Sequence, residues 1–295
     1  MDRLEAMSIL VAIAETGSLS AAGRRLNQPL SSISRKISDL EAHLKTRLLT
    51  RTSRQAALTD SGRAYLVACR RILEEVAEAE RAAAGEYAAP RGGLVITAPI
   101  VFGRKHVLPV VLDFLAAYPE VDIRLALIDR RVALVEDHID LALRIGPLAD
   151  SSLVALKLGV MRRVVVAAPA YLERRGRPRH PDDLARHDCI DASGVRPTSD
   201  WSFGAALPVR SRLDVNTAEA AIDAAIAGAG LARVLLYQAA QAVREGKLSV
   251  VLEEFEPDPW PVSLVHAGQG LLPLKLRAFI DFAAPALRTC LSRIG

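Results

Sequence analysis

The sequence predicts an α/β protein that begins with a small all-α unit. Two observations predict this class. Up to residue 87 the apolar residues recur at helical spacing, and after a hinge at residues 90–93 short apolar runs alternate with helical segments. The chain has 295 residues, of which 51% are hydrophobic and 24% are charged, and this suits a globular protein with more than one core.

The first 45 residues are expected to form three helices. The first spans residues 2–15, and Gly17 suits the left-handed position after its end. Ser18 can cap a second, short helix, and residues 27–29 form a tight break before a third helix at residues 30–45. Two short helices joined by a three-residue turn need a third helix to bury their apolar sides. The segment therefore predicts a tri-helical helix-turn-helix unit.

The third helix carries a polar and basic face, and the charge around it is uneven. Residues 20–71 hold eleven Lys and Arg against three Asp and Glu, whereas residues 72–86 hold five Glu against one Arg. A basic block is expected of a phosphate-binding surface, although a solvated face or a plain three-helix bundle would show a similar pattern. Residues 19–64 contain no Phe, Tyr or Trp, which argues against single strands and RNA and favours duplex DNA.

A small β-hairpin is expected at residues 48–58, with Arg51 and Arg54 near its tip. Such a wing lies along the DNA backbone or minor groove and adds phosphate contacts. Thr59 can then cap a long helix over residues 60–87. Its apolar positions are spaced 4, 3, 4, 3 and 4 apart, as in a two-position heptad seam: Tyr65, Cys69, Ile72, Val76, Ala79 and Ala83. The seam suits pairing with a second copy; packing against its own domain is the alternative.

The remainder of the chain alternates strands with helices, which predicts a parallel sheet with helices on its faces. The expected strands are residues 94–98, 121–128, 140–145, 164–168, 209–215, 231–235 and 261–266. The expected helices are residues 102–118, 131–137, 171–175, 218–227, 236–244 and 274–287. Two α/β lobes with a cleft between them would place a ligand at the carboxyl ends of strands and at helix N-termini.

Several segments resemble the LysR-type transcriptional regulators. ETGSLSAAGRRLN and SSISRKISDLEAHLKTRLLTRTSRQAALTDSGRAYL look like that family's N-terminal domain. GGLVITAPIVFGRKHVLPVVLDFLAAYPEVDIRLALIDR, DLALRIGPLADSSLVALKLG and AAPAYLERRGRPRHPDDLARHDCI are similar to its effector-binding domain. The resemblance covers essentially the whole chain. It implies an α/β fold with an N-terminal all-α winged helix-turn-helix and a two-lobed, periplasmic-binding-protein-like C-terminal domain.

The resemblance also implies a domain plan. Residues 1–59 would be the winged helix-turn-helix DNA-binding domain and residues 60–90 the dimerisation helix. Residues 91–295 would be the effector-binding regulatory domain, with lobe I at 91–160 and 262–295 and lobe II at 161–261. The chain would cross between the lobes near residues 159–163 and 257–262.

The function implied is that of a sequence-specific DNA-binding transcriptional regulator, controlled by a small-molecule effector bound between the lobes. The expected partners are double-stranded promoter DNA, the effector, and further copies in a homodimer or homotetramer, with RNA polymerase as a further candidate. No enzymatic activity, metal or cofactor is expected.

Site residues are carried over by position. DNA contacts fall on Leu30, Ser31, Ser32, Ser34, Arg35, Arg51 and Arg54. Many members place Ser-Gln-Pro before the recognition helix, whereas this chain has Pro29-Leu30-Ser31. Leu30 cannot make the bidentate adenine contact of a Gln, but it can touch a thymine methyl group.

The effector site falls on residues of both lobes: Ala98, Pro99, Ile100, Val101, Arg144, Gly146, Asn216, Thr217 and Val234. The first four offer no hydroxyl group where related proteins often have Ser or Thr, so we expect a fairly apolar pocket. A carboxylate would be held there by helix N-terminal N–H groups or by Arg144. Arg144 as a structural ion-pair residue is the alternative.

Two other classes of function are weighed against this one. An enzyme is disfavoured because residues 228–233 match only part of a dinucleotide fingerprint and suit a helix end, and because His138 lies in a polar turn without further ligands. A solute-binding protein would need a secretion signal, which MDRLEAMSIL is not. Cys69, Cys189 and Cys290 lack metal-ligand spacing and suit buried positions in a reducing compartment. We expect a cytoplasmic protein with no membrane-spanning segment.

Overall fold

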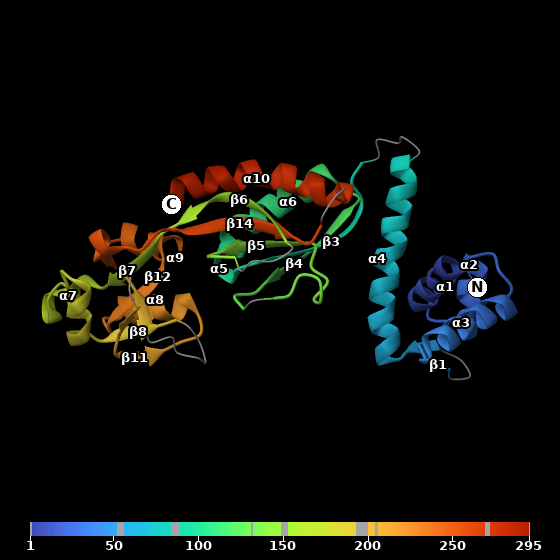
Figure 1. Cartoon of the computed structure of the whole chain (residues 1–295), viewed down its shortest axis with the longest axis horizontal. Coiled ribbons are helices and arrows are strands. Elements are labelled where there is room, and N and C mark those ends of the chain that lie inside the picture. Colours follow the sequence, from blue (N-terminus) through green and yellow to red (C-terminus); the bar gives the residue numbers. More distant parts are fainter. Residues whose placement is uncertain are drawn as a thin grey trace. The chain divides into compact units, whose positions relative to one another are not determined.

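The computed structural model describes residues 2–51, 56–83, 89–130, 132–148, 153–192, 200–203, 206–268 and 272–294. They form two compact units, Met1–Ala89 and Pro90–Gly295, and each is described by itself (Figure 1). Among these residues no single helix is both long and apolar enough to cross a membrane. Arg3–Thr16 and Leu19–Arg25, bent by 115° from each other, meet the criterion of length and composition only as a pair.

The first unit begins with three helices whose ends were predicted from local residues. Asp2 caps α1 (Arg3–Thr16) by accepting a hydrogen bond from Leu4 N at 3.0 Å. Gly17 ends that helix with φ at 73°. Ser18 Oγ then caps α2 (Leu19–Arg25) by accepting from Ala21 N at 3.1 Å. After the turn, α3 spans Leu30–Leu44.

The turn between α2 and α3 is tight. Asn27 adopts φ of 52°, which an asparagine tolerates better than most residues. A Cβ atom on Gly23 would lie 2.8 Å from the carbonyl oxygen of Gln28, so only glycine lets the turn close against α2.

The core of the first unit joins all of its helices. The fully buried side chains are Ala6, Ile9, Leu10 and Ile13 of α1, Ala22 of α2, Ile33, Ile37 and Leu40 of α3, and Cys69 of the long helix α4 (Asp60–Ala83). A short hairpin of β1 (Leu49–Arg51) and β2 (Ala56–Leu58) precedes α4. Thr59 Oγ1 caps α4 by accepting from Gly62 N at 2.9 Å, as predicted. The unit is therefore a winged helix-turn-helix.

Lobe I of the second unit is a five-stranded sheet in the order β4-β3-β5-β14-β6. Its strands are β3 (Gly92–Ala98), β4 (Val121–Leu127), β5 (Leu141–Ile145), β6 (Val154–Met161) and β14 (Trp260–His266). Its helical segments are α5 (Ile100–Phe102), a π-helical turn at Gly103–Val107, α6 (Leu108–Ala117) and α10 (Leu274–Ile294). Figure 1 shows α6 and α10 running along the sheet. Their side chains bury Phe102, Phe114 and Phe279 against it.

Lobe II is a second five-stranded sheet in the order β11-β8-β12-β7-β13. Its strands are β7 (Arg163–Ala167), β8 (Cys189–Asp191), β11 (Ser211–Asp214), β12 (Leu231–Leu235) and β13 (Ser249–Val251), and a hairpin of β9 (Asp200–Ser202) and β10 (Ala206–Pro208) adjoins the lobe. The helices are α7 (Pro169–Arg175), α8 (Ala218–Ile226) and α9 (Leu236–Arg244), with 3₁₀ turns at Pro181–Arg186 and Glu253–Phe255.

Strand β7 shows how lobe II is layered. Val164 and Val166 are buried in a cluster with residues of α8 and α9. Val165 and Ala167 are buried in a cluster with Tyr171 and Leu172 of α7. Because successive residues of a strand point to opposite faces, a run of apolar residues here means burial on both faces.

Two expectations for the second unit were wrong. The sheets are mixed rather than parallel, because β14 runs antiparallel to β5 and β6, and β7 runs antiparallel to β12 and β13. The predicted helix at residues 131–137 is a single turn among its described residues. His138 leaves that turn with φ of 53°, and Asp137 uses its carboxylate to accept from Ala133 N at 3.1 Å.

The chain passes between the two sheets twice. The first passage is one residue long, because β6 ends at Met161 and β7 begins at Arg163. The second passage leads from β13 through the Glu253–Phe255 turn to β14. The predicted crossings near residues 159–163 and 257–262 overlap with these passages.

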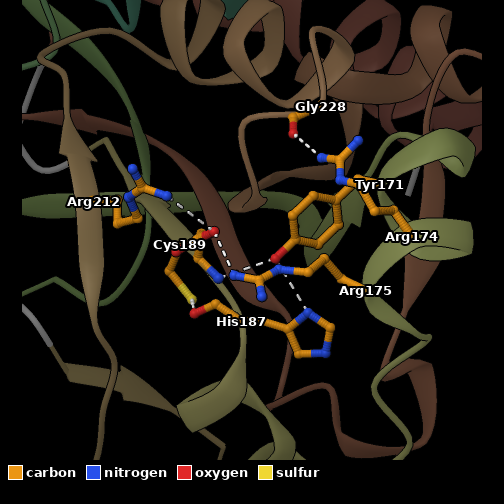
Figure 2. A network of polar contacts seen from close by, with 8 residues as sticks. Tyr171, Arg174, Arg175, His187, Cys189, Arg212 and Gly228 are labelled. Atoms are coloured by element: carbon orange, nitrogen blue, oxygen red, sulfur yellow. Dashed lines mark hydrogen bonds and ion pairs between the residues drawn. The ribbon is translucent and has the colours of Figure 1, made fainter.

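A polar network, buried at Tyr171 and His187 and exposed at its arginines, ties α7 to the strands of lobe II (Figure 2). The Tyr171 hydroxyl accepts from Asp188 N at 3.0 Å and lies 3.2 Å from His187 Nδ1. Arg175 and Arg212 both reach the Asp188 carboxylate, at 3.0 and 3.4 Å. The Arg175 guanidinium, with Arg212 beside it, holds the pKa of Asp188 below its ordinary value. The network stabilises the lobe.

Candidate DNA-binding surface and effector site

The first turn of α3 presents the side chains predicted to meet DNA. Leu30 is 51% exposed, more than Leu4, which is 40% exposed in α1 of the same unit. Ser31 and Arg35 are exposed and lie four residues apart, on one face of the helix, while Ser32 and Ser34 are half-buried. A methyl-rich side chain beside hydroxyl and guanidinium donors can contact both base edges and phosphates.

The orientation of α3 is fixed from both ends by carboxylates. Near its start, Lys36 Nζ donates to Glu5 Oε1 of α1, and Gln28 Nε2 donates to the same oxygen at 2.9 Å. The bond from Lys36 is the main reason that the pKa of Glu5 lies below its ordinary value. Near the end of α3, Glu41 Oε1 accepts from the backbone N–H groups of Leu48 at 2.8 Å and Leu49 at 3.0 Å. The recognition helix is therefore positioned against both α1 and the wing.

The wing is paired in the register Leu49↔Leu58, Thr50↔Ala57 and Arg51↔Ala56. Thr50 Oγ1 donates to the carbonyl oxygen of Ala57 at 3.0 Å, which reinforces the hairpin. Arg51 ends β1, but its side chain and the whole of Arg54 lie outside the described residues. Their predicted DNA contacts therefore stay predictions.

The predicted dimerisation seam of α4 divides into two parts. Cys69 is fully buried in the core of its own unit and Tyr65 packs against that core, so packing against its own domain holds for this part of the seam. Burial raises the pKa of the Cys69 thiol to about 11. Ile72 and Val76 are only half-buried and Ala79 is exposed. The Ala83 side chain lies outside the described part of the chain. Ile72, Val76 and Ala79 thus remain available to a second copy.

The predicted effector residues of lobe I lie at one edge of its sheet. Strands β3 and β5 are parallel, so Ala98 at the end of β3 and Gly146 just after β5 lie at the same carboxyl edge. Ala98 and Val101 are buried, Pro99 is half-buried and Ile100 is 37% exposed. Gly146 has φ of 116°, a conformation that favours glycine.

The groups expected to hold a carboxylate in lobe I already have partners. Ile100 N donates to Asp129 Oδ1 at 3.0 Å, so a carboxylate of the chain itself occupies the start of α5. Arg144 is half-buried and donates to the carbonyl oxygen of Val132 at 3.2 Å. An anionic effector would have to displace these contacts or bind elsewhere.

The predicted residues of lobe II lie at the carboxyl edge of its parallel strands β8, β11 and β12. Asn216 is exposed, and Thr217 Oγ1 caps α8 by accepting from Ala220 N at 3.2 Å. Val234 is buried among residues of α8 and α9 in the core of the lobe, so its side chain contributes packing there.

The two carboxyl edges meet at Tyr237, a residue that the sequence analysis missed. Tyr237 belongs to α9 of lobe II, yet it is 3% exposed within the core of lobe I. Its ring lies 5.3 Å from that of Phe102, edge to face, and 6.2 Å from that of His106. Burial is the main cause that raises its pKa, and Gln238 Nε2 donates to its hydroxyl group at 3.4 Å. Asp129 was missed as well. No local pattern marks either residue.

A winged helix-turn-helix followed by a two-lobed α/β domain defines a DNA-binding regulator that responds to a small molecule. The chain belongs to the LysR family of transcriptional regulators. Residues 4–63 match the model described as bacterial regulatory helix-turn-helix protein, lysR family, and residues 88–288 match the LysR substrate binding domain.

Individual relatives agree with this assignment. An HTH-type transcriptional regulator of Xanthomonas campestris pv. campestris is 36% identical over 95% of this chain and 84% of its own length. The HTH-type transcriptional activator AaeR of Escherichia coli is 33% identical over 95% of this chain and 93% of its own. The structure of CrgA, a LysR-type regulator of Neisseria meningitidis, has a TM-score of 0.60 and 30% identity, covering 96% of this chain and 98% of its own. The chain is thus a transcriptional regulator with a helix-turn-helix and an effector-binding domain.

Proposed function

We propose that this regulator acts in the cytoplasm by binding rather than by catalysis. In this proposal residues 1–59 bind promoter DNA, residues 60–90 pair two copies, and residues 91–295 bind the effector, with lobe I at 91–160 and 262–295 and lobe II at 161–261. Homodimers assemble further into a homotetramer, and RNA polymerase is a candidate partner at the promoter. The part of the α4 seam that is not buried in its own unit, at Ile72, Val76 and Ala79, supports the pairing.

The main support for the proposed DNA contacts is the first turn of α3, whose orientation is fixed by neighbouring elements. Leu30, Ser31 and Arg35 are exposed on a helix whose direction is fixed by Glu5 and Glu41. Ser32 and Ser34 adjoin them, and Arg51 and Arg54 of the wing complete the proposed surface. Contacts held at a fixed orientation can read base edges, whereas a mobile basic patch would bind any duplex.

The test begins with genomic mapping of the sites that the purified protein binds, followed by titration of one such duplex at several salt concentrations. Arg35→Ala should weaken binding several-fold and lower the salt slope by about 1, because one phosphate-contacting charge is lost. Arg104→Ala, which removes an exposed charge from lobe I, serves as the control and should change neither quantity. Equal binding by Arg35→Ala and the wild type would refute this surface.

The proposed effector site is the junction of the two carboxyl edges. It comprises Ala98, Pro99, Ile100, Val101, Arg144, Gly146, Asn216, Thr217 and Val234. Because Val234 is buried in the core of its lobe, its contribution would be indirect. The contact between Phe102 and Tyr237 supports the proposal, since it joins the two lobes at this place. A ligand here would change how the lobes meet.

A further inference from the structure

A hollow of about 680 Å³, largely open to solvent, lies where the chain passes between the lobes, and we call it the hinge cavity. Pro147, Trp260 and Pro261 of lobe I line one part, Arg163 and Phe203 of lobe II line another, and residues 254–259 of the second passage complete it. None of the residues predicted for the effector site lines it. A cavity of this volume is in the range of small-molecule sites.

Arg163 is a cation that lines the hinge cavity, and it forms no ion pair with any carboxylate of the described residues. Its guanidinium lies over the ring of Trp260 at 4.3 Å. Its Nε atom is buried and makes no hydrogen bond with any described residue. Burial lowers the pKa of Arg163. A charged group that is taken out of water without a partner is costly, so an anion bound beside it would be stabilised.

The preceding residue, Arg162, differs from Arg163 because its guanidinium forms an ion pair. Arg162 donates to both carboxylate oxygens of Glu256, each at 2.8 Å, and lies 3.7 Å from Glu253. Glu256 is thereby committed to Arg162, although it lines the hinge cavity. The two adjacent arginines therefore have different roles. Arg162 joins the two passages through its hydrogen bonds with Glu256, whereas the guanidinium of Arg163 can bind an added anion.

A second guanidinium reinforces the positive character of this face. Arg233 of β12 is paired with Val165 of β7, which places it on the same face of the sheet as Arg163. Burial first, and then the charge of Arg163, lowers the pKa of Arg233 to about 10. Arg233 stacks on Trp201 at 5.4 Å. The carboxylate of Asp191 offsets part of the charge of Arg233, so the favoured place for an anion is beside Arg163, which lines the hinge cavity.

The residues that line the hinge cavity indicate which class of anion it can bind. Phe203, Phe255 and Trp260 supply aromatic surface, which suits a planar ring. Glu254 and Asp258 are exposed carboxylates at the rim. They would repel a ligand that carries a second negative charge outside the reach of Arg163.

We propose that the hinge cavity is a second ligand site, separate from the effector site at the carboxyl edges, and that it binds planar aromatic monocarboxylates. The carboxylate pairs with Arg163 and the ring packs against Phe203, Phe255 and Trp260. A ligand in this place touches lobe I, lobe II and the second passage at once. Its binding therefore stiffens the connection about which the lobes would move.

The test uses the full chain labelled with 5-fluorotryptophan. The sequence has two tryptophans, Trp201 and Trp260, so the ¹⁹F spectrum contains two signals that Trp260→Phe assigns. On titration with 2-naphthoate the Trp260 signal should shift and saturate. The neutral isostere 2-naphthamide and the dianion naphthalene-2,3-dicarboxylate should bind at least about 10-fold more weakly, because the first lacks the charge and the second meets the acidic rim.

Variants separate this site from the effector site. By calorimetry, Arg163→Met should weaken 2-naphthoate binding about 10- to 100-fold, the range expected for losing a charge-assisted hydrogen bond. Arg244→Met, at an exposed arginine of α9, is the matched control, and Asn216→Ala changes the proposed effector site. Both should bind as the wild type does. Should Arg163→Met fail to fold, Arg163→Lys, which keeps the charge without the planar fork, should bind several-fold more weakly.

Three results would overturn the proposal: equal affinity for 2-naphthoate and 2-naphthamide, unchanged binding in Arg163→Met or Arg163→Lys, or loss of binding in Asn216→Ala alone. The last result would place the ligand in the effector site and leave the proposed function intact. If neither the wild type nor any variant binds 2-naphthoate, the proposal of a hinge site is refuted, while the proposed DNA binding is unaffected.

Discussion

Replacing Gly62 by alanine probes how α4 is joined to the wing. A Cβ atom on Gly62 would lie 2.9 Å from the carbonyl carbon of Leu48 and closer still to its oxygen. Backbone atoms cannot yield there cheaply, because the same oxygen accepts from Thr59 N at 2.9 Å. Overpacking costs about 1–3 kcal/mol, and the better helix propensity of alanine returns about 1 kcal/mol. The added Cβ would also strain the hydrogen bond by which Thr59 caps α4, which costs about 1 kcal/mol more. We therefore expect the free energy of unfolding of the first unit to fall by about 2 kcal/mol.

Hydrogen exchange of the full chain measures this loss locally. A loss of about 2 kcal/mol corresponds to roughly 30-fold faster exchange in peptides from α3 and α4, if they exchange by opening of the first unit. Peptides of lobe I should be unchanged. Ser61→Ala, at the exposed neighbouring position of the same helix, is the control and should exchange like the wild type or more slowly. Slower exchange in Gly62→Ala would show that propensity outweighs the contact and would refute this reasoning.

Two further predictions concern the recognition helix and pH. Lys36→Met removes the contact with Glu5 and should weaken DNA binding up to about fivefold. The dependence of DNA affinity on salt concentration should stay as in the wild type. A weaker salt dependence, like that expected for Arg35→Ala, would mean that Lys36 contacts phosphate. Burial lowers the pKa of His187 in the folded protein below its ordinary value of 6.5. As pH falls, His187 of the unfolded chain therefore binds its proton at a higher pH than His187 of the folded protein. Thermal stability should decrease as pH falls from 6.5 through the pKa of the folded protein. His187→Gln should flatten that decline in a melting series from pH 7.5 to 5.5, and a flat wild-type series would contradict the assignment.

Features encoded by neighbouring residues were predictable from the sequence. Gly17, Ser18 and Thr59 end or begin helices through contacts within four residues, so their types alone predict the boundaries. The same holds for Gly228, which follows α8 with φ of 78°, as predicted for a glycine after a helix end. The recognition helix was predicted for a related reason, since Ile33 and Ile37 define its buried face by spacing alone.

Features that depend on distant pairing were not predictable. Strand β6 is largely exposed at the edge of its sheet, so it shows no buried periodicity. β8 is three residues long, too short for any pattern. Cys290 was expected to be buried, but it is half-buried and lies 3.1 Å from His106 Nδ1, a contact between residues 184 positions apart. At the candidate effector site, the partners of Ile100 and Phe102 come from other elements for the same reason.

Tyr237 sets a threshold on the ligands that can open the effector domain. Its ring is buried in the other lobe, and exposing a tyrosine of about 150–250 Å² to water costs at least about 4 kcal/mol at 25 cal/mol per Å². That cost equals nearly three powers of ten in affinity. A molecule that separated the lobes would bind about a thousandfold more weakly than its own contacts allow. A micromolar effector of this regulator therefore leaves Tyr237 seated or brings a ring of its own to fill the space that Tyr237 vacates.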